Sequence, residues 1–239
     1  MSDRKLGILY GISVGTGDPE LITVKGLRLL QQASVVAFPA GREDSRGFAE
    51  QIITPWLLPE QQKLALEFPY LQNQTQLQQA WQSAAKQVWY YLQKGQDVAF
   101  ACEGDLSFYS TFTYLSQTLQ QLYPETVIET VPGVCSPMAA AAALGIPLTV
   151  RSQRLAILPA LYSPQDLETV LDWADVIVLM KVSSVYQEVW QILKESHLLE
   201  RAWVVEWATR PEQVIYSNLE NHPQLALSYF SLLVIQVRG

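Results

Sequence analysis

The sequence predicts an α/β protein, because short apolar runs alternate with segments of helical periodicity along nearly the whole chain. Residues 73–94 repeat apolar side chains at helical spacing, and Gly95 follows as a typical residue after a helix end. Residues 98–102, VAFAC, then have the length and composition of a buried strand. Glu103-Gly104-Asp105 ends that strand, and an aromatic, hydroxyl-rich segment begins the next helix.

The other elements follow the same alternation. Strands are expected at residues 6–14, 34–40, 64–68, 127–131, 154–158, 175–180, 203–207 and 229–237. Helices are expected at residues 20–32, 48–58, 137–144 and 184–194. One more helix is expected to end at about residue 122, and another to start at residue 163. Tyr123-Pro124-Glu125-Thr126 interrupts the pattern, so we expect two domains, residues 1–122 and 123–239.

Composition excludes several classes of protein. Of the 239 residues, 49% are apolar and 16% charged, which is typical of a globular protein with a substantial core. The net charge of −7 disfavours a nucleic-acid partner, because phosphate binding requires a basic face. Two cysteines and two histidines, far apart in sequence, predict neither a disulfide framework nor a metal site. No apolar run reaches about 18 residues and no signal-peptide pattern is present, so we expect a cytoplasmic protein without a membrane partner.

Two strand ends are followed by loops that contain glycine. Gly15-Thr16-Gly17 lacks the third glycine of a dinucleotide fingerprint and the G-K-[ST] of a phosphate loop, so neither class is supported. At the second loop, Gly104 permits close backbone approach and Asp105 can accept hydrogen bonds from a ligand. The ordinary alternative for this pair is a tight strand-to-helix turn with a capping aspartate.

Several segments together resemble the tetrapyrrole methylase family: GISVGTGDPELITVKGLRLL, EGDLSFYS, VPGVCSPMAAAAALGIPL, LMK and ATRPEQ, in this order over essentially the whole chain. The resemblance implies two α/β domains with the active site in the cleft between them, a homodimer, and S-adenosylmethionine as methyl donor. Within the family the motifs are most similar to the branch that methylates the C-20 meso carbon of precorrin-2 in cobalamin biosynthesis.

The resemblance also implies which residues hold the donor and its product, S-adenosylhomocysteine. They are Gly104, Asp105, Phe108, Cys135, Ser136, Met180, Ala208 and Ser231. An apolar slot with a few main-chain partners suits adenine, and a carboxylate suits a sulfonium. Each position also has an ordinary alternative, such as core filling by Met180 or the start of a helix at Cys135.

Precorrin-2 carries several carboxylates, so cations in the predicted loops are expected to bind it: Arg42, Arg46, Lys181 and Arg210. A sulfonium is already activated, so the transfer requires no protein nucleophile, and catalysis comes mainly from alignment in a dry cleft. Asp105 and Glu206 are both candidates for a base, and the sequence does not choose between them. Thr16, Trp207 and Arg210 depart from the family pattern, the last two at expected substrate contacts.

Two other functions stay open at this point. The first is methylation by the same fold of a different tetrapyrrole or of a macromolecule, namely ribosomal RNA or a histidine-derived residue of an elongation factor. A non-catalytic nucleotide-binding module is the second alternative. The acidic balance of the chain argues against RNA as the substrate.

Overall fold

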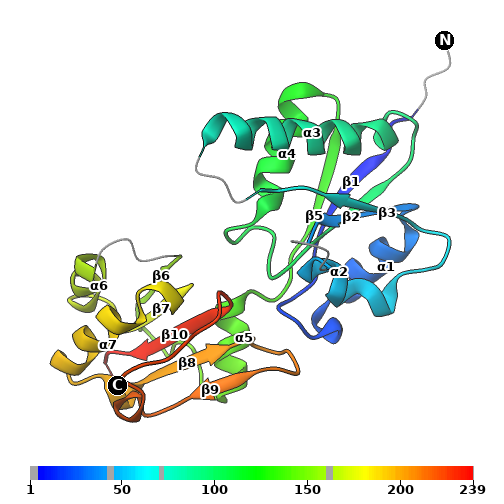
Figure 1. The fold of residues 1–239 in the computed structure, drawn as a ribbon. Helices are drawn as coiled ribbons and strands as arrows, with labels where there is room; N and C mark the ends of the chain where they lie inside the picture. The colour runs from blue at the N-terminus through cyan, green and yellow to red at the C-terminus, as the bar shows by residue number, and fades with distance from the viewer. Residues whose placement is uncertain (1–4, 42–45, 70–72, 160–163, 239) are drawn as a thin grey trace. The chain divides into compact units, whose positions relative to one another are not determined.

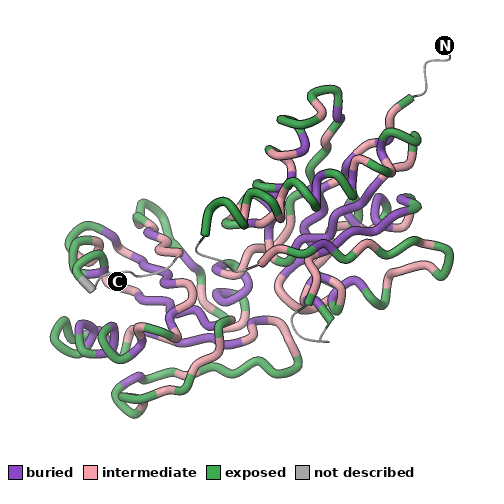
Figure 2. The backbone as a smooth tube through the Cα atoms, turned by 45° about the horizontal axis from the view of Figure 1, so that its top comes forward, coloured by how far each residue is buried: buried purple, intermediate pink, exposed green. Residues whose placement is uncertain are grey.

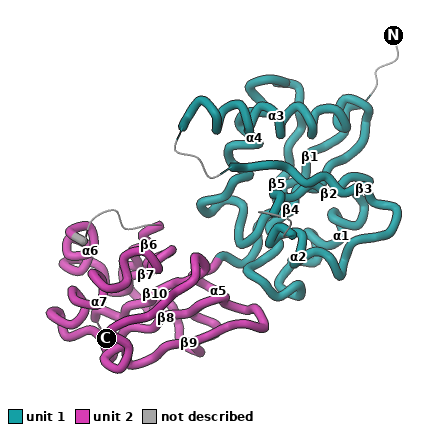
Figure 3. Tube along the Cα trace, in the orientation of Figure 1, with its two compact units in different colours: residues 1–135 teal, residues 136–239 magenta. Residues whose placement is uncertain are grey.

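The computed structural model describes residues 5–41, 46–69, 73–159 and 164–238 (Figure 1). They form two compact units, residues 1–135 and 136–239, each described by itself below (Figure 3). Both units combine a five-stranded sheet with helices, which confirms the expected α/β class. Buried backbone lies mainly in the strands, while the helices show exposed outer faces (Figure 2).

The sheet of unit 1 is parallel throughout, in the order β3-β2-β4-β1-β5. Its strands are β1 (Ile8–Ser13), β2 (Val35–Pro39), β3 (Gln62–Leu66), β4 (Val98–Cys102) and β5 (Val127–Val131). Because all strands run the same way, their carboxyl ends lie at one edge of the sheet. The loops that follow β1, β4 and β5 therefore share that edge.

Helices cover both faces of this sheet. They are α1 (Val24–Gln32), α2 (Phe48–Ile53), α3 (Gln74–Leu92) and α4 (Thr111–Leu122). Side chains alternate along β4, so Phe100 packs in a core with α3 and α4, whereas Ala99 and Ala101 pack with α1 and α2. Side-chain caps begin α1 and α4: the side chain of Thr23 accepts from Gly26 N, and that of Ser110 from Phe112 N.

Unit 2 has a mixed sheet in the order β6-β7-β10-β8-β9. Its strands are β6 (Leu155–Leu158), β7 (Val176–Met180), β8 (Ala202–Glu206), β9 (Val214–Tyr216) and β10 (Ser231–Gln236). Only β6 and β7 pair in parallel; β10 runs antiparallel to both of its neighbours. Its helices are α5 (Ser136–Leu144), α6 (Pro164–Leu171) and α7 (Tyr186–Glu195). Helices α6 and α7 share one core with the sheet, and α5 contacts β10.

Short 3-10 helices complete the described chain at Pro19–Leu21, Thr54–Trp56, Val182–Ser184, Leu199–Arg201 and Leu219–Asn221. The first of them explains why α1 begins at Val24 rather than at the expected Glu20: Asp18 caps the 3-10 turn, and Thr23 then caps the α-helix. Strand β9 was not expected from the sequence, since it has only three residues, two of them exposed.

The compact units divide the chain at a different place from the expected junction after Leu122. Strand β5 pairs in parallel with β1, from Ile8↔Val127 to Ile12↔Val131. This pairing joins residues 127–131 to the first sheet, and the units therefore meet after Cys135. The Pro124 break ends α4 without ending the first unit.

Candidate active site

The connections that leave β1 and β4 go to opposite faces of the unit 1 sheet. After β1 the chain enters α1, whose Leu30 packs with Ile12 in one core. After β4 it enters α4, whose Phe112 packs with Phe100 in the other core. In parallel α/β sheets, ligands bind at the carboxyl ends of neighbouring strands whose connections diverge in this way. The ends of β1 and β4 are therefore the place in unit 1 where a site is expected.

Two glycines join these strand ends. Gly15 N donates to Gly104 O at 3.3 Å, and Gly104 N donates to Gly15 O at 2.6 Å. Both have positive φ, +80° and +67°, a conformation that side chains rarely adopt. A Cβ atom at Gly104 would meet nothing within 4 Å, so open space lies over its backbone. A ligand has room to approach the main chain at this position.

Asp105 connects the same edge through its carboxylate. Oδ1 accepts from Ser107 N at 2.8 Å and from the Ser107 hydroxyl at 2.5 Å. Oδ2 accepts from Gly133 N at 2.7 Å, in the loop after β5, and from Ser13 Oγ at 3.5 Å, at the end of β1. Ser13 Oγ in turn accepts from Leu106 N at 2.9 Å. One buried carboxylate thus joins the loops that follow three strands.

These hydrogen bonds determine the ionisation of Asp105. Burial is the largest single influence and by itself would raise its pKa, but the donors from Ser107, Gly133 and Ser13 together outweigh it. The pKa of Asp105 therefore lies below its ordinary value, and the side chain is a carboxylate at neutral pH. The neighbouring Cys102 thiol behaves oppositely: burial raises its pKa to about 12, so it is neutral.

The other predicted residues of unit 1 have different positions. Phe108 N donates to Asp105 O at 3.0 Å, and its ring lies 4.7 Å from that of Tyr109. Cys135 is half-buried, two residues after the Gly133 contact. Arg46 is exposed and precedes Gly47, where a Cβ atom would lie 2.2 Å from Pro39 O at the end of β2. Arg42 lies outside the described residues.

In unit 2, strand pairing brings the predicted residues to one edge of the sheet. Ser231 begins β10 opposite Glu206, the last residue of β8, and Met180 at the end of β7 pairs with Leu232. Lys181 N donates to Ser231 O at 3.0 Å. Ser136 begins α5, and Ala208 is buried two residues after β8. The hydroxyl of Ser231, which is 1% exposed, has no hydrogen-bond partner within the described part of the chain.

The backbone at this edge is strained. Lys181, Trp207 and Thr209 have φ values of +56°, +52° and +68°, although none is glycine. A left-handed conformation is especially unfavourable for a β-branched threonine. Conformations of this kind persist only where surrounding contacts impose them, and they cluster at functional sites.

Glu206 is the buried carboxylate of this edge. Its Oε1 accepts from Ser228 N at 2.6 Å and its Oε2 from the Tyr216 hydroxyl at 3.3 Å. Nearby backbone bonds fix the same turn, since Trp207 N donates to Phe230 O at 3.0 Å. Glu206 therefore links β8 to β9 and to the segment that enters β10.

Three aromatic rings with a cation at each end lie along this edge. The rings of Trp207 and Phe230 are 4.8 Å apart, and those of Tyr229 and Phe230 are 5.3 Å apart. Lys181 Nζ lies 5.1 Å from the Tyr229 ring centre, and Arg210 Cζ lies 5.2 Å from that of Trp207. Arg210 also forms an ion pair of 3.8 Å with Glu212. This arrangement combines flat apolar surface with positive charge, which suits a conjugated anion.

The sequence did not reveal the partners of the predicted residues. Ser13, Ser107 and Gly133 hold Asp105, and Tyr229 and Phe230 accompany Lys181 and Trp207. One signal was available, because Ser13 is a polar residue at the end of an otherwise apolar run. In the structure it is fully buried. A buried hydroxyl requires a partner, but the sequence does not say which one.

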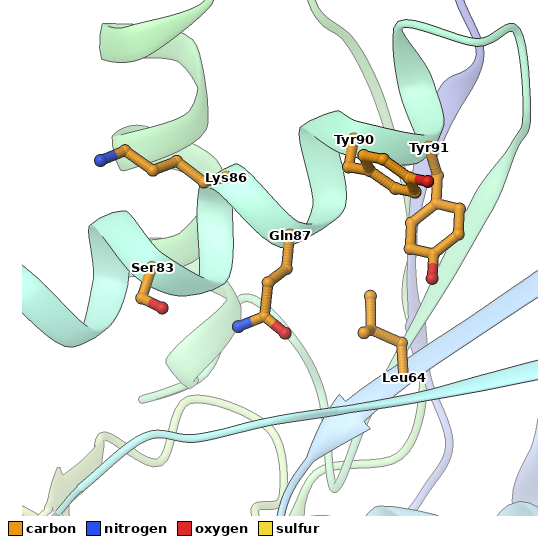
Figure 4. A pocket seen from close by; sticks show the side chains of 6 residues that line it. All are labelled: Leu64, Ser83, Lys86, Gln87, Tyr90 and Tyr91. Carbon is orange, nitrogen blue, oxygen red and sulfur yellow. The ribbon is translucent and has the colours of Figure 1, made fainter.

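An open pocket on the surface of unit 1 lies away from these strand ends. It has a volume of about 370 Å³ and is lined by Leu64 on β3 and by Ser83, Lys86, Gln87, Tyr90 and Tyr91 on α3 (Figure 4). None of the predicted site residues lines it. Within the described residues, no three His, Cys, Asp or Glu side chains are grouped to hold a metal ion, and no helix is long and apolar enough to span a membrane.

Comparison with known proteins identifies relatives over nearly the full length of this chain. The chain is 30% identical to the cobalt-precorrin-2 C(20)-methyltransferase of Salmonella typhimurium over 96% of both chains. It is 29% identical to the precorrin-2 C(20)-methyltransferase of a Sinorhizobium species over 98% of this chain and 97% of the relative. It is also 33% identical to the cobalamin biosynthesis protein CobIJ of Mycobacterium tuberculosis over 96% of this chain, and spans 46% of that relative's length.

Solved structures share the fold. A cobalt precorrin-4 methyltransferase matches with a TM-score of 0.74 at 24% identity, covering 97% of this chain and 96% of the other. A uroporphyrin-III C-methyltransferase from Thermus thermophilus, solved with S-adenosylhomocysteine, matches with a TM-score of 0.63 at 21% identity, over 96% and 97% of the two chains. Residues 8–222 match the tetrapyrrole (corrin/porphyrin) methylases as a family. The chain that carries these two edges, one lined by glycines and one by aromatic rings, therefore belongs to the tetrapyrrole methylase family.

Proposed function

We propose that this protein transfers a methyl group from S-adenosylmethionine to the C-20 meso carbon of precorrin-2 or its cobalt complex. The observation that carries the proposal is the 30% identity to a cobalt-precorrin-2 C(20)-methyltransferase over 96% of both chains. The chain spans about half the length of its mycobacterial relatives. What those longer proteins do as a whole therefore applies to this chain only as a proposal.

The residues present fit an S-adenosyl ligand. Open space lies over the backbone of Gly104, and Ser231 presents a buried hydroxyl without a described partner. Met180 and Ala208 supply apolar surface at the edge of the unit 2 sheet. We propose that Gly104, Asp105, Phe108, Cys135 and Ser136 also belong to this site, as the family resemblance implies. When bound, the donor supplies an activated methyl group.

Cations are proposed to hold the carboxylates of the tetrapyrrole. Lys181 and Arg210 flank the rings of Tyr229, Phe230 and Trp207 at one edge of unit 2. A flat macrocycle can stack on such rings while its carboxylates meet the cations. Arg46, in the loop after β2, is proposed to act with them. Trp207 departs from the family pattern, and we propose that its ring takes part in substrate binding with the neighbouring aromatic rings.

The proposed chemistry requires mainly positioning. Holding the reacting carbon and the methyl group in line removes most of the entropic cost of the encounter. Apolar walls that exclude water strengthen the electrostatic contacts of the site. Both candidate bases, Asp105 and Glu206, accept hydrogen bonds on both of their carboxylate oxygens.

The deciding experiment incubates the protein with methyl-labelled donor and precorrin-2, with and without cobalt, and locates the new methyl group by NMR. Label at C-20 is expected. Parallel reactions contain a uroporphyrin-III-type tetrapyrrole or ribosomes. Label in either of these, with none in precorrin-2, contradicts the proposal. Binding of S-adenosylhomocysteine without transfer to any acceptor would favour a non-catalytic module.

A substitution separates the two halves of the proposal. Arg42→Ala is expected to raise the KM for the tetrapyrrole about tenfold, as loss of one charge-assisted contact does, and to leave the Kd for S-adenosylhomocysteine nearly unchanged. Loss of product binding instead would contradict this division.

A homodimer in the cytoplasm is also proposed; sedimentation of the purified protein at micromolar concentration tests the dimer.

A further inference from the structure

The carboxylate of Asp105 makes two kinds of contact. The local kind is a turn: Oδ1 accepts from Ser107 N and from the Ser107 hydroxyl, two residues along the chain. The second kind is long-range: Oδ2 accepts from Gly133, 28 residues away, and from Ser13, 92 residues away. A turn-capping aspartate requires only the first kind. The second kind connects three strand ends.

The long-range contacts lie where the backbone is crowded. A Cβ atom at Gly133 would lie 2.5 Å from Ser13 Cβ, so the loop after β5 packs directly on the end of β1. Ser13 Oγ accepts from Leu106 N at 2.9 Å, which returns the contact to the loop after β4. The paired bonds between Gly15 and Gly104 complete the set. The three loops therefore form one hydrogen-bonded unit with Asp105 at its centre.

Both oxygens of this carboxylate are thereby occupied. Each accepts from one backbone N–H and one hydroxyl, and Asp105 is 9% exposed. A general base requires an oxygen that can reach the proton it removes. The donors around Asp105 stabilise its charged form and oppose protonation.

We propose that Asp105 is a positioning residue of the methyl-donor site: it sets the backbone of Gly104 and of the 132–135 loop for the nucleoside, and it takes no proton in the reaction. This inference rests on the proposed function for the identity of the ligand. It assigns the contact with the ligand to main-chain groups that Asp105 holds, and it leaves another group or solvent to accept any proton lost from the substrate.

The test compares Asp105→Asn with Asp97→Asn. Asp97 precedes β4 at the opposite edge of the same sheet, where its Oδ1 accepts from Ile8 N at 2.8 Å. Both variants make the same chemical change in a carboxylate that joins elements of unit 1. An asparagine at 105 must turn its NH₂ group toward either the Ser107 or the Gly133 donors, which breaks one set of contacts. An asparagine at 97 keeps its carbonyl oxygen, which can still accept the single hydrogen bond from Ile8 N.

The readout is the Kd for S-adenosylhomocysteine by calorimetry. Loss of a buried, charge-assisted pair of bonds should raise the Kd about tenfold or more in Asp105→Asn, against less than about twofold in Asp97→Asn. Ser13→Ala, which removes a cross-loop contact, should raise it more than Ser107→Ala, which removes a local one. Equal changes in the Asp105 and Asp97 variants, or a larger effect of Ser107→Ala, would overturn the proposal.

The pH profile of kcat with precorrin-2 provides the second readout. Asp105→Asn is expected to keep the shape of the wild-type profile at saturating donor. A fall in kcat of about 100-fold or more with unchanged product binding, and loss of one limb of the profile, would identify Asp105 as a base and refute positioning. If the wild type binds S-adenosylhomocysteine but does not methylate precorrin-2, the proposed function fails while the Kd comparison still decides the role of Asp105.

Discussion

The two sheet edges that carry the predicted site residues are built differently. In unit 1 the edge is made of backbone: Gly15 and Gly104 are paired by hydrogen bonds, Gly133 packs on Ser13, and one aspartate joins three loops. In unit 2 the edge is made of side chains: Trp207, Tyr229 and Phe230 pack beside two cations, on a backbone with positive φ at bulky residues.

We propose that the two edges have different tasks. Backbone groups at glycines suit a ligand whose polar atoms are met by the main chain, such as a nucleoside. Aromatic faces with flanking cations suit a larger conjugated anion. Each edge also has one buried carboxylate, but Asp105 accepts from four donors and Glu206 from two. Substitutions at the unit 1 edge should therefore have the larger effect on binding of the methyl donor.

The largest effect is expected for Gly133→Ala. The new Cβ atom would lie 2.5 Å from Ser13 Cβ and 3.2 Å from Ser13 O, and β1, an interior strand paired on both sides, cannot yield easily. We expect a loss of about 2 kcal/mol in the free energy of unfolding, as for other overpacked sites, and a Kd for S-adenosylhomocysteine raised about tenfold or more. Urea titration and calorimetry measure the two quantities. Wild-type values of both would show that the loops move independently.

Gly104→Ala and Gly145→Ala form a matched pair with a smaller effect. Both glycines have φ of +67°, and a Cβ atom at either would meet nothing within 4 Å. Each substitution should cost about 1 kcal/mol of stability through backbone conformation alone. Only Gly104→Ala should also weaken binding of S-adenosylhomocysteine, because Gly145 follows α5 in unit 2. Equal binding by both variants would remove Gly104 from the site.

A still smaller effect is expected for Glu206→Gln. A glutamine can keep the bond from Ser228 N through its carbonyl oxygen and turn its NH₂ group toward the Tyr216 hydroxyl. The free energy of unfolding should fall by less than about 1 kcal/mol, with little change in product binding. Steady-state kinetics add a decision on mechanism: a fall in kcat of about 100-fold or more would identify Glu206 as the base.

The smallest effect concerns acid stability of unit 2. Asp175 accepts from Arg154 and pairs with Arg238 at 3.5 Å, and the Arg154 hydrogen bonds lower its pKa from 3.8 to about 2. Because this pKa is lower in the folded state, the contribution is present above pH 4 and is lost as the pH falls from about 4 to 2. Urea midpoints between pH 5 and pH 2 should fall less steeply in Asp175→Asn than in the control Asp166→Asn. Identical slopes would show that the pair contributes nothing measurable.

Much of the fold was predictable from local pattern. The run at 98–102 is strand β4, and the helical spacing at 73–94 is α3, because both signals depend on neighbouring residues alone. The short strand β9 was missed, since three residues with two exposed carry no periodicity. The division of the units after Cys135 depends on the pairing of β5 with β1 and was not readable from the Pro124 break.

The candidate site follows the same rule. By itself the sequence determined where strands end and which chemical groups stand there, so Gly104 and Asp105, and Lys181 after β7, could be selected as candidates. Only the tertiary structure decided which groups meet. Ser13 and Gly133 reach Asp105 across 92 and 28 residues, and strand register places Ser231 opposite Glu206. Local periodicity reports the fate of each segment, whereas contacts of this kind arise only when the sheet assembles, because hydrogen-bond partners are chosen by strand order in space.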